Sequence, residues 1–166
     1  MTGVVAWGSV CSALAAVFQG VDGYAAPTTS TVGVPVFDGL PVTGAQMDRF
    51  VLVGADPSGD TAGSFQREQT AMGGSSALGR YTEAGTIRCF CVAQTGDPDV
   101  SSVRSIALGM LDDLYSAVQA DATLGGAVPK LIDTLVSGGD IAVGQTKSGA
   151  YAEASFTVAY QVLSGV

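Results

Sequence analysis

The chain has 166 residues, of which 47% are hydrophobic and 13% are charged, so it is not a disordered chain and it is long enough for one folded domain. Fifteen acidic against seven basic residues give a net charge of −8, the wrong sign for binding nucleic-acid phosphates. Histidine is absent, which excludes Ser-His-Asp and Cys-His catalysis and most zinc sites. We expect a single domain over residues 1–166.

The N-terminal segment from residue 4 to residue 21 carries no charge. A signal peptide begins with basic residues, and a membrane span needs about 20 apolar residues in a row. This segment has no basic start, and polar residues such as Ser12 and Gln19 interrupt it. The pattern favours a buried helix that is apolar over most of its circumference, with a signal or membrane segment as the alternative.

Two strands are expected in the next part of the chain. Residues 22–33 contain Pro27 and several Thr and Gly, and predict an ordered loop with no core face. Residues 34–37 predict a short strand, which a turn at 38–41 ends. The continuous apolar run at 49–54 predicts a central strand covered on both faces.

A polar strand is expected from Ser64 to Met72, after a solvated loop at 56–60. Alternation places its side chains on two faces: Phe65, Arg67 and Gln69 on one, and Gln66, Glu68 and Thr70 on the other. Neither face is apolar enough to build a core. This strand is therefore a candidate for contact with another molecule.

The segment that begins at residue 86 predicts a strand followed by a long helix. Residues 86–94 alternate with the period of a strand. Asp97 is expected to cap the helix N-terminus, and Pro98 suits the first helical position. Asp99 complements the positive end of the helix dipole.

An apolar stripe at spacings of three and four defines this helix, which Gly125 and Gly126 follow: Val100, Val103, Ile106, Ala107, Met110, Leu111, Leu114 and Val118. Asp112 and Asp113 lie away from the stripe and indicate a solvated face. Such a helix is stable only against a flat apolar surface, so the rest of the chain must supply a sheet.

The last part of the chain predicts further strands. Residues 129–136 suit either a helical turn or a strand, and we favour the strand. Glycines bracket residues 141–146, and residues 151–163 alternate as a half-buried final strand. The order of elements indicates an α+β domain with a mostly antiparallel sheet and two helices packed on one face.

No set of residues in the sequence supports a reaction mechanism. Cys11, Cys89 and Cys91 are interpreted as small buried hydrophobes, since three thiols do not make a disulfide framework. Lys147 follows its glycines two residues too late for a phosphate-binding loop. The loop at 56–60 lacks most ligands of a calcium loop. We expect no catalytic residue, no cofactor and no metal.

Seven stretches in chain order carry a family resemblance: the apolar first helix, Val36-Phe37-Asp38-Gly39-Leu40-Pro41-Val42-Thr43, Phe50-Val51-Leu52-Val53-Gly54, Phe65-Gln66-Arg67-Glu68-Gln69, Ile87-Arg88-Cys89 leading to Thr95-Gly96-Asp97, Ala120-Asp121-Ala122-Thr123-Leu124-Gly125-Gly126, and Ala154-Ser155-Phe156-Thr157-Val158. Together they resemble the tail terminator (tail-completion) proteins of long-tailed bacteriophages, of the type found in phages of actinobacteria. The resemblance covers nearly the whole chain. The uncharged first helix and the loop at 22–33 depart from the family pattern.

The resemblance implies a virion protein of the tail or neck, present in the host cytoplasm during assembly. In this family a ring, usually of six copies, caps the tail tube, stops tube polymerisation and offers a surface for head–tail joining. The implied partners are further copies of the chain in a homo-hexamer, the tail tube protein and the head–tail connector or stopper protein. Six copies would carry a charge of about −48, so DNA is expected to pass the lumen without specific binding.

A ring with head-to-tail contacts needs two different patches on each subunit. One candidate patch is the polar strand, and the other lies beside the apolar stripe of the long helix. The candidate residues for a subunit or tube interface are therefore Phe65, Arg67, Glu68 and Gln69 on the strand, and Leu108 and Tyr115 on the helix.

Two other functions stay open at this point. One is a secreted or cell-envelope binding domain whose uncharged N-terminal segment is a signal or an anchor. The other is a neck stopper or connector protein, which is a close neighbour of the terminator in the same particle.

Overall fold

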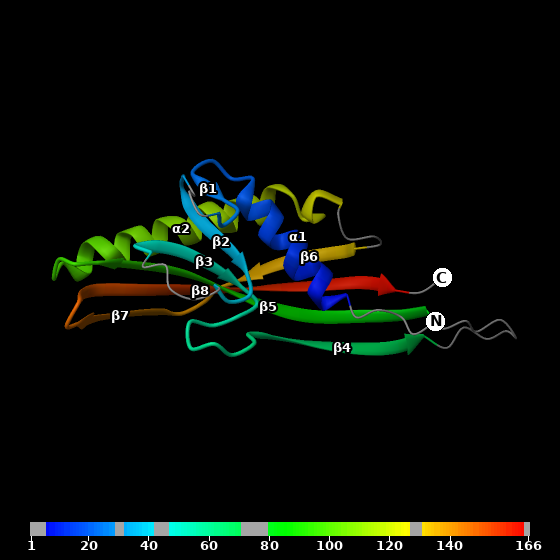
Figure 1. Ribbon diagram of the computed structural model, residues 1–166. Helices are drawn as coiled ribbons and strands as arrows, with labels where there is room; N and C mark the ends of the chain where they lie inside the picture. The colour runs from blue at the N-terminus through cyan, green and yellow to red at the C-terminus, as the bar shows by residue number, and fades with distance from the viewer. Residues whose placement is uncertain (1–5, 29–31, 42–46, 71–79, 127–130, 165–166) are drawn as a thin grey trace, which may run out of the picture.

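The computed structural model describes residues 6–28, 32–41, 47–70, 80–126 and 131–164 (Figure 1). Several ends of expected elements, at residues 4–5, 71–72 and 129–130, lie outside the described residues. The elements follow one another along the chain as α1 (Trp7–Gln19), β1 (Tyr24–Ala25), β2 (Val34–Asp38), β3 (Arg49–Val53), β4 (Gly63–Thr70), β5 (Arg80–Thr95), α2 (Val100–Ala120), the 3₁₀ turn η1 (Leu124–Gly126), β6 (Leu131–Ser137), β7 (Ile141–Thr146) and β8 (Gly149–Ser164).

Two long antiparallel strands, β5 and β8, form the centre of the sheet and pair over their whole length, from Tyr81 opposite Ser164 to Thr95 opposite Ala150. Each long strand has two shorter neighbours on its outer side. On β5 these are β3 and β4, and on β8 they are β7 and β6. The sheet is therefore β3-β5-β8-β7 at one end and β4-β5-β8-β6 at the other, with β2 and β1 continuing beyond β3.

Both helices pack on one face of this sheet, as the sequence predicts (Figure 1). The stripe of α2 supplies Val103, Ala107, Met110, Leu114 and Val118 as buried residues, with Val100, Ile106 and Leu111 partly buried beside them. The sheet meets them with the alternate residues of β8, from Ala150 to Val162. Burial of apolar surface between these two layers is the main stabilising contribution to the fold.

Helix α1 crosses the same face and is buried on more than one side. Its buried residues include Leu14 and Phe18, and the Phe18 ring meets the Phe156 ring edge-on at 6.0 Å between centroids. The Trp7 Nε1–H donates to the Thr86 carbonyl at 3.1 Å. Neither α1 nor α2, the two α-helices of the described residues, is long and apolar enough to cross a membrane.

The strand predictions are largely confirmed. β3 is buried on both faces along Val51, Leu52 and Val53, and β2 and β5 pair with its two edges. Residues 131–137 form a strand, which confirms the prediction of a strand and not a helical turn for this segment. Five of the seven strand pairings of the described residues are antiparallel, and β1–β2 and β2–β3 are parallel. The α+β class with a mostly antiparallel sheet is therefore confirmed.

The predicted cap of the long helix is wrong by two residues. Asp99, in extended conformation, is the N-cap, and its Oδ1 accepts hydrogen bonds from the Ser101 and Ser102 N–H groups at 3.0 and 3.2 Å. Pro98 therefore precedes the cap and does not open the helix. Asp97 lies outside the helix, and its carbonyl accepts from the Ala150 N–H at 3.0 Å.

The loop at 22–33 does have a core face, contrary to the sequence prediction. Tyr24 is buried and lies in β1, which pairs in parallel with β2 at Val34. The Tyr24 hydroxyl donates to Asp113 Oδ2 at 2.9 Å. Asp113 is thus not only part of a solvated face, because it fixes this loop to α2.

Candidate functional site

The first candidate surface is β4, which lies at an edge of the sheet and pairs with β5 alone among the described strands (Figure 1). Its start is set by Gly63, whose φ of +157° is a backbone conformation that other residues rarely adopt. A Cβ there would lie 2.4 Å from the Thr86 carbonyl oxygen, so only glycine fits this close approach. The strand then runs antiparallel to residues 80–87 of β5.

Phe65 is 47% exposed on this strand, on the same face of the sheet as the helices. It lies opposite Gly85, and the Tyr160 ring from β8 lies directly over that glycine. Phe65 therefore lies on the core face of the sheet, in the same row as Gly85 and Tyr160 but at the edge strand. The structure places this predicted interface residue where a partner can reach it.

Arg67, another candidate interface residue, forms an ion pair within its own chain. It lies opposite Glu83, and its Nε–H donates to Glu83 Oε2 at 2.8 Å. The Arg67 side chain is only 23% exposed, and that of Glu83 is fully buried. The Arg67 guanidinium thus compensates a buried carboxylate within its own chain, and its place in a subunit or tube interface stays a prediction.

Glu83 is the centre of a polar cluster beneath α1. Besides Arg67, it accepts a hydrogen bond from the Ala6 N–H at 3.0 Å and one from the Tyr160 hydroxyl at 2.8 Å. Burial by itself raises the pKa of this carboxyl. The hydrogen bonds from Arg67, Ala6 and Tyr160 and the charge of Arg67 outweigh burial, so the pKa of Glu83 lies below its ordinary value.

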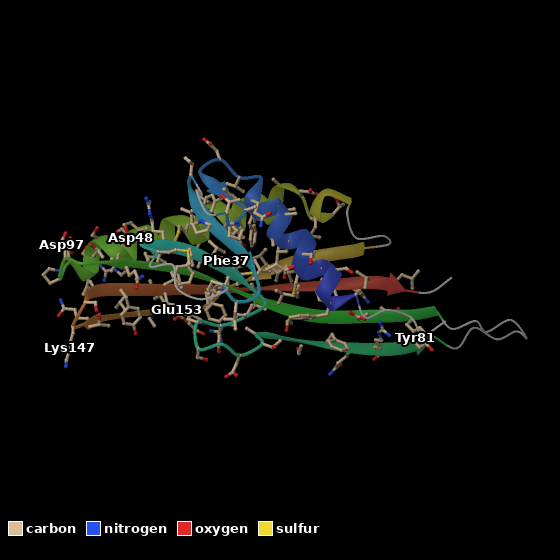
Figure 2. All side chains as sticks on the ribbon, in the orientation of Figure 1. Phe37, Asp48, Tyr81, Asp97, Lys147 and Glu153 are labelled. Atoms are coloured by element: carbon tan, nitrogen blue, oxygen red, sulfur yellow. The ribbon has the colours of Figure 1, made fainter. Side chains whose placement is uncertain are left out.

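The other two strand candidates lie nearby. Glu68 is exposed and lies opposite Thr82. The backbone of Gln69 lies opposite Tyr81, near the end of the long strands. Figure 2 shows Tyr81 at one end of these strands and Asp97 and Lys147 at the other, so β4 belongs to the end remote from the β7–β8 turn.

The second candidate surface is the outer side of α2, where Leu108 is 41% exposed and Tyr115 is half-buried. The two residues are seven apart and lie on one side of the helix. Figure 1 shows α2 over the end of the sheet opposite to β4. The structure therefore does not bring the six candidate residues together, and they form two separate surfaces.

Sequence reasoning missed exposed apolar residues on the opposite edge of the sheet. Leu135 on β6 is 67% exposed, and Ile141 and Val143 on β7 are exposed too. The sequence did contain a signal for an exposed apolar residue on β6. The apolar residues at 131–136 fall on both faces of a strand, and only one face can enter the core. Which face is buried depends on the pairing with β8.

The three cysteines are free thiols and are buried, as expected. Burial, with the nearby charge of Asp38, raises the pKa of Cys11 to about 12. Burial, with the charge of Asp113, raises the pKa of Cys91 to about 12, and burial raises that of Cys89 well above its ordinary value. These thiols stay protonated at neutral pH and do not form part of either surface.

The described residues contain an open cavity of about 330 Å³ near the β7–β8 turn, lined by Asp48, Val92, Gln94, Thr95, Gly96, Thr146, Ser148, Gly149, Ala150 and Tyr151. Its lining mixes backbone, hydroxyl and amide groups with a single carboxylate. Neither this cavity nor any other place among the described residues has a group of three or more Cys, Asp or Glu side chains that could hold a metal ion. The loop at 56–60 is instead closed by Asp56, whose Oδ1 accepts from Ser58, Gly59 and Asp60.

No protein-family model and no curated protein sequence matches this chain.

Proposed function

We propose that this protein is an assembly protein of a bacteriophage tail, which forms a ring that caps the tail tube, ends tube polymerisation and offers a surface for head–tail joining. The observation that carries the proposal is the position of the exposed apolar residues on two separate elements, with Phe65 on β4 and Leu108 on α2. A ring seated on a tube needs more than one contact surface on each subunit. The α+β arrangement is compatible with this function, which the resemblance described above suggests.

Charge supports the part of the proposal that concerns DNA. The chain carries a net charge of −8, and several of its acidic side chains, including Asp60, Asp97 and Asp140, are exposed. A ring of such subunits repels the phosphate backbone. DNA therefore passes the ring without being held by it.

The export alternative is less well supported, because α1 belongs to the core. Leu14 and Phe18 are fully buried between α1 and the sheet, so cleavage or membrane insertion of this helix would uncover the core. The intact mass of the chain recovered from its native host tests this point. Loss of the N-terminal helix would favour the export alternative.

Tail length tests the proposal directly. In a phage that encodes this chain, interruption of the gene should yield tail tubes that are longer than normal and lack heads, as measured by electron microscopy of the lysate. Tails of normal length that carry heads would contradict the capping function. This result would contradict the capping function regardless of which residues form the subunit contacts.

Complementation of the interrupted gene tests the α2 surface. Leu108→Lys places a charge in a half-exposed apolar position and should lower the titre by about tenfold or more if the surface contacts the tube or connector. Gln119→Lys is the matched control, since Gln119 is exposed on the same helix. An unchanged titre for Leu108→Lys would remove α2 from the contact surfaces.

A further inference from the structure

The exposed apolar residues of this protein gather on the edge strands of its sheet. The described residues expose seven large apolar side chains, and four of them lie on β4, β6 or β7: Phe65, Leu135, Ile141 and Val143. Folded proteins protect such edges with lysine and other charged residues, with proline or with β-bulges. Lysine and proline are absent from β4 and β6, although β4 carries Arg67 and Glu68 and β6 has a register shift. Among the described residues no strand pairs with the outer edge of β4 or of β6, so their backbone N–H and C=O groups are available to a further strand.

The edges of β4 and β6 lie at the same level of the sheet. β4 pairs with residues 80–87 of β5, and the same part of β5 pairs with residues 158–164 of β8. On the other side of β8, residues 157–162 pair with β6. Four strands in the order β4-β5-β8-β6 therefore cross this end of the molecule, and each is antiparallel to the next (Figure 1).

The polarity of these four strands suits a head-to-tail contact. Because their number is even and their directions alternate, β4 and β6 run in opposite directions. A second copy placed beside the first would bring its β6 antiparallel to β4 and continue the alternation. The lengths also match, with eight residues in β4 and seven in β6, where a register shift separates Leu131 from Asp133.

We propose that β4 of one copy pairs with β6 of the next, so that the sheet continues from subunit to subunit. The occupant of each edge is a second copy of this chain, because the chain itself offers two open edges of matching level, length and polarity. A foreign strand would cover one edge and leave the other open. The contact is heterologous, and repeated copies form a closed ring when the rotation between them closes. This inference rests on the ring of the proposed function and names its subunit contact, which leaves the Leu108 surface for the tube or connector.

Cysteine cross-linking of the purified full chain tests this contact between β4 of one copy and β6 of the next, which we call the seam. Leu135 and the residues Ser64, Gln66 and Glu68 all lie on the face of the sheet away from the helices, since they pair with Ala159 and with Thr86, Ala84 and Thr82. Leu135→Cys is therefore combined with a cysteine at each of the three β4 positions in turn, to sample the possible registers. The native thiols are buried and do not interfere. At least one combination should form a ladder of disulfide-linked oligomers on oxidation.

A matched control uses Phe65→Cys with Leu135→Cys, because Phe65 lies on the opposite face and its thiol should form no ladder. In light scattering, Leu135→Lys should convert oligomers to monomers, whereas Leu108→Lys should leave them intact. Failure of all three combinations, cross-linking of β4 cysteines to one another, or a chain that is monomeric throughout would each overturn the seam. Normal capping of tails by Leu135→Lys would overturn the seam but leave the capping function standing. If the cysteine variants form the ladder but interruption of the gene leaves tail length unchanged, the capping function is overturned and the seam stands.

Discussion

The Tyr160 hydroxyl donates a hydrogen bond to Glu83 Oε1 at 2.8 Å, and both residues are buried. This contact joins the two central strands beneath α1, where the Ala6 N–H donates to the other carboxylate oxygen. Arg67 brings β4 to the same carboxylate. One acidic side chain therefore connects the first helix, the edge strand and the centre of the sheet.

Replacement of Glu83 should strongly destabilise the fold. Glu83→Ala leaves the buried part of the Arg67 guanidinium and the Tyr160 hydroxyl without their acceptor, and removal of one partner from a buried pair costs about 3 kcal/mol or more. Glu68→Ala, on the exposed side of the same hairpin, should change the free energy of unfolding by less than about 0.5 kcal/mol. Urea unfolding followed by circular dichroism measures both. Equal effects would show that the cluster contributes little.

The stability of the protein should fall in acid partly through Glu83. Its pKa in the folded protein lies below its ordinary value, which is about 4.3 in an unfolded chain, so the unfolded state binds the proton more readily. The stabilisation is present above that value and is lost as the pH falls through the lower pKa of the folded state. The Glu83→Gln variant has no carboxyl group to protonate at this position, so it does not lose this stabilisation in acid. The difference in unfolding free energy between the two proteins should shrink on acidification, and a constant difference would contradict the linkage.

Gly85 should not tolerate a side chain. A Cβ at this position would lie 2.6 Å from the Tyr160 ring, so Gly85→Ala forces the ring away from Glu83 and should cost about 1–3 kcal/mol. Gly109→Ala is the control, because a Cβ there meets nothing within 4 Å and α2 gains helix propensity. The control should raise the melting temperature while Gly85→Ala lowers it. A rise in melting temperature for both variants would contradict the predicted clash with Tyr160.

The position of the helix cap can be measured. Asp99→Ala removes the acceptor of the Ser101 and Ser102 N–H groups and should cost about 1 kcal/mol. Asp97→Ala removes a carboxylate outside the helix and should cost much less. Thermal unfolding of the two variants decides between the residues. A larger loss for Asp97→Ala would return the cap to the position expected from the sequence.

The thiols should react only when the protein unfolds. Burial keeps Cys11 and Cys91 protonated, each with a pKa of about 12, and the pKa of Cys89 is raised too. A thiol reagent at pH 8 should therefore modify no cysteine on the time scale of mixing, and all three in denaturant. Rapid modification of one thiol in the native protein would reveal local opening at that site.

Much of the fold follows from local patterns. The stripe from Val100 to Val118 and the alternation at 151–163 predict a helix and a strand because one buried face imposes its period on the side chains. The run at 49–54 predicts a strand covered on both faces because it is continuously apolar and does not alternate. The exposed candidates Phe65 and Leu108 could also be found in this way, since Phe65 is an apolar residue in a polar strand and Leu108 lies beside the apolar stripe of its helix.

Other features depended on contacts between distant parts of the chain. Tyr24 and Asp113 are 89 residues apart, and Glu83 and Tyr160 are 77 apart, so no local period relates them. The face of Leu135 was likewise decided by its pairing with β8. The sequence by itself determined most of the segments that form helices and strands, because periodicity is local, but it did not reveal β1 at Tyr24–Ala25. Only the tertiary structure decided which polar groups are buried together and which edges stay open, because both depend on strand order and register.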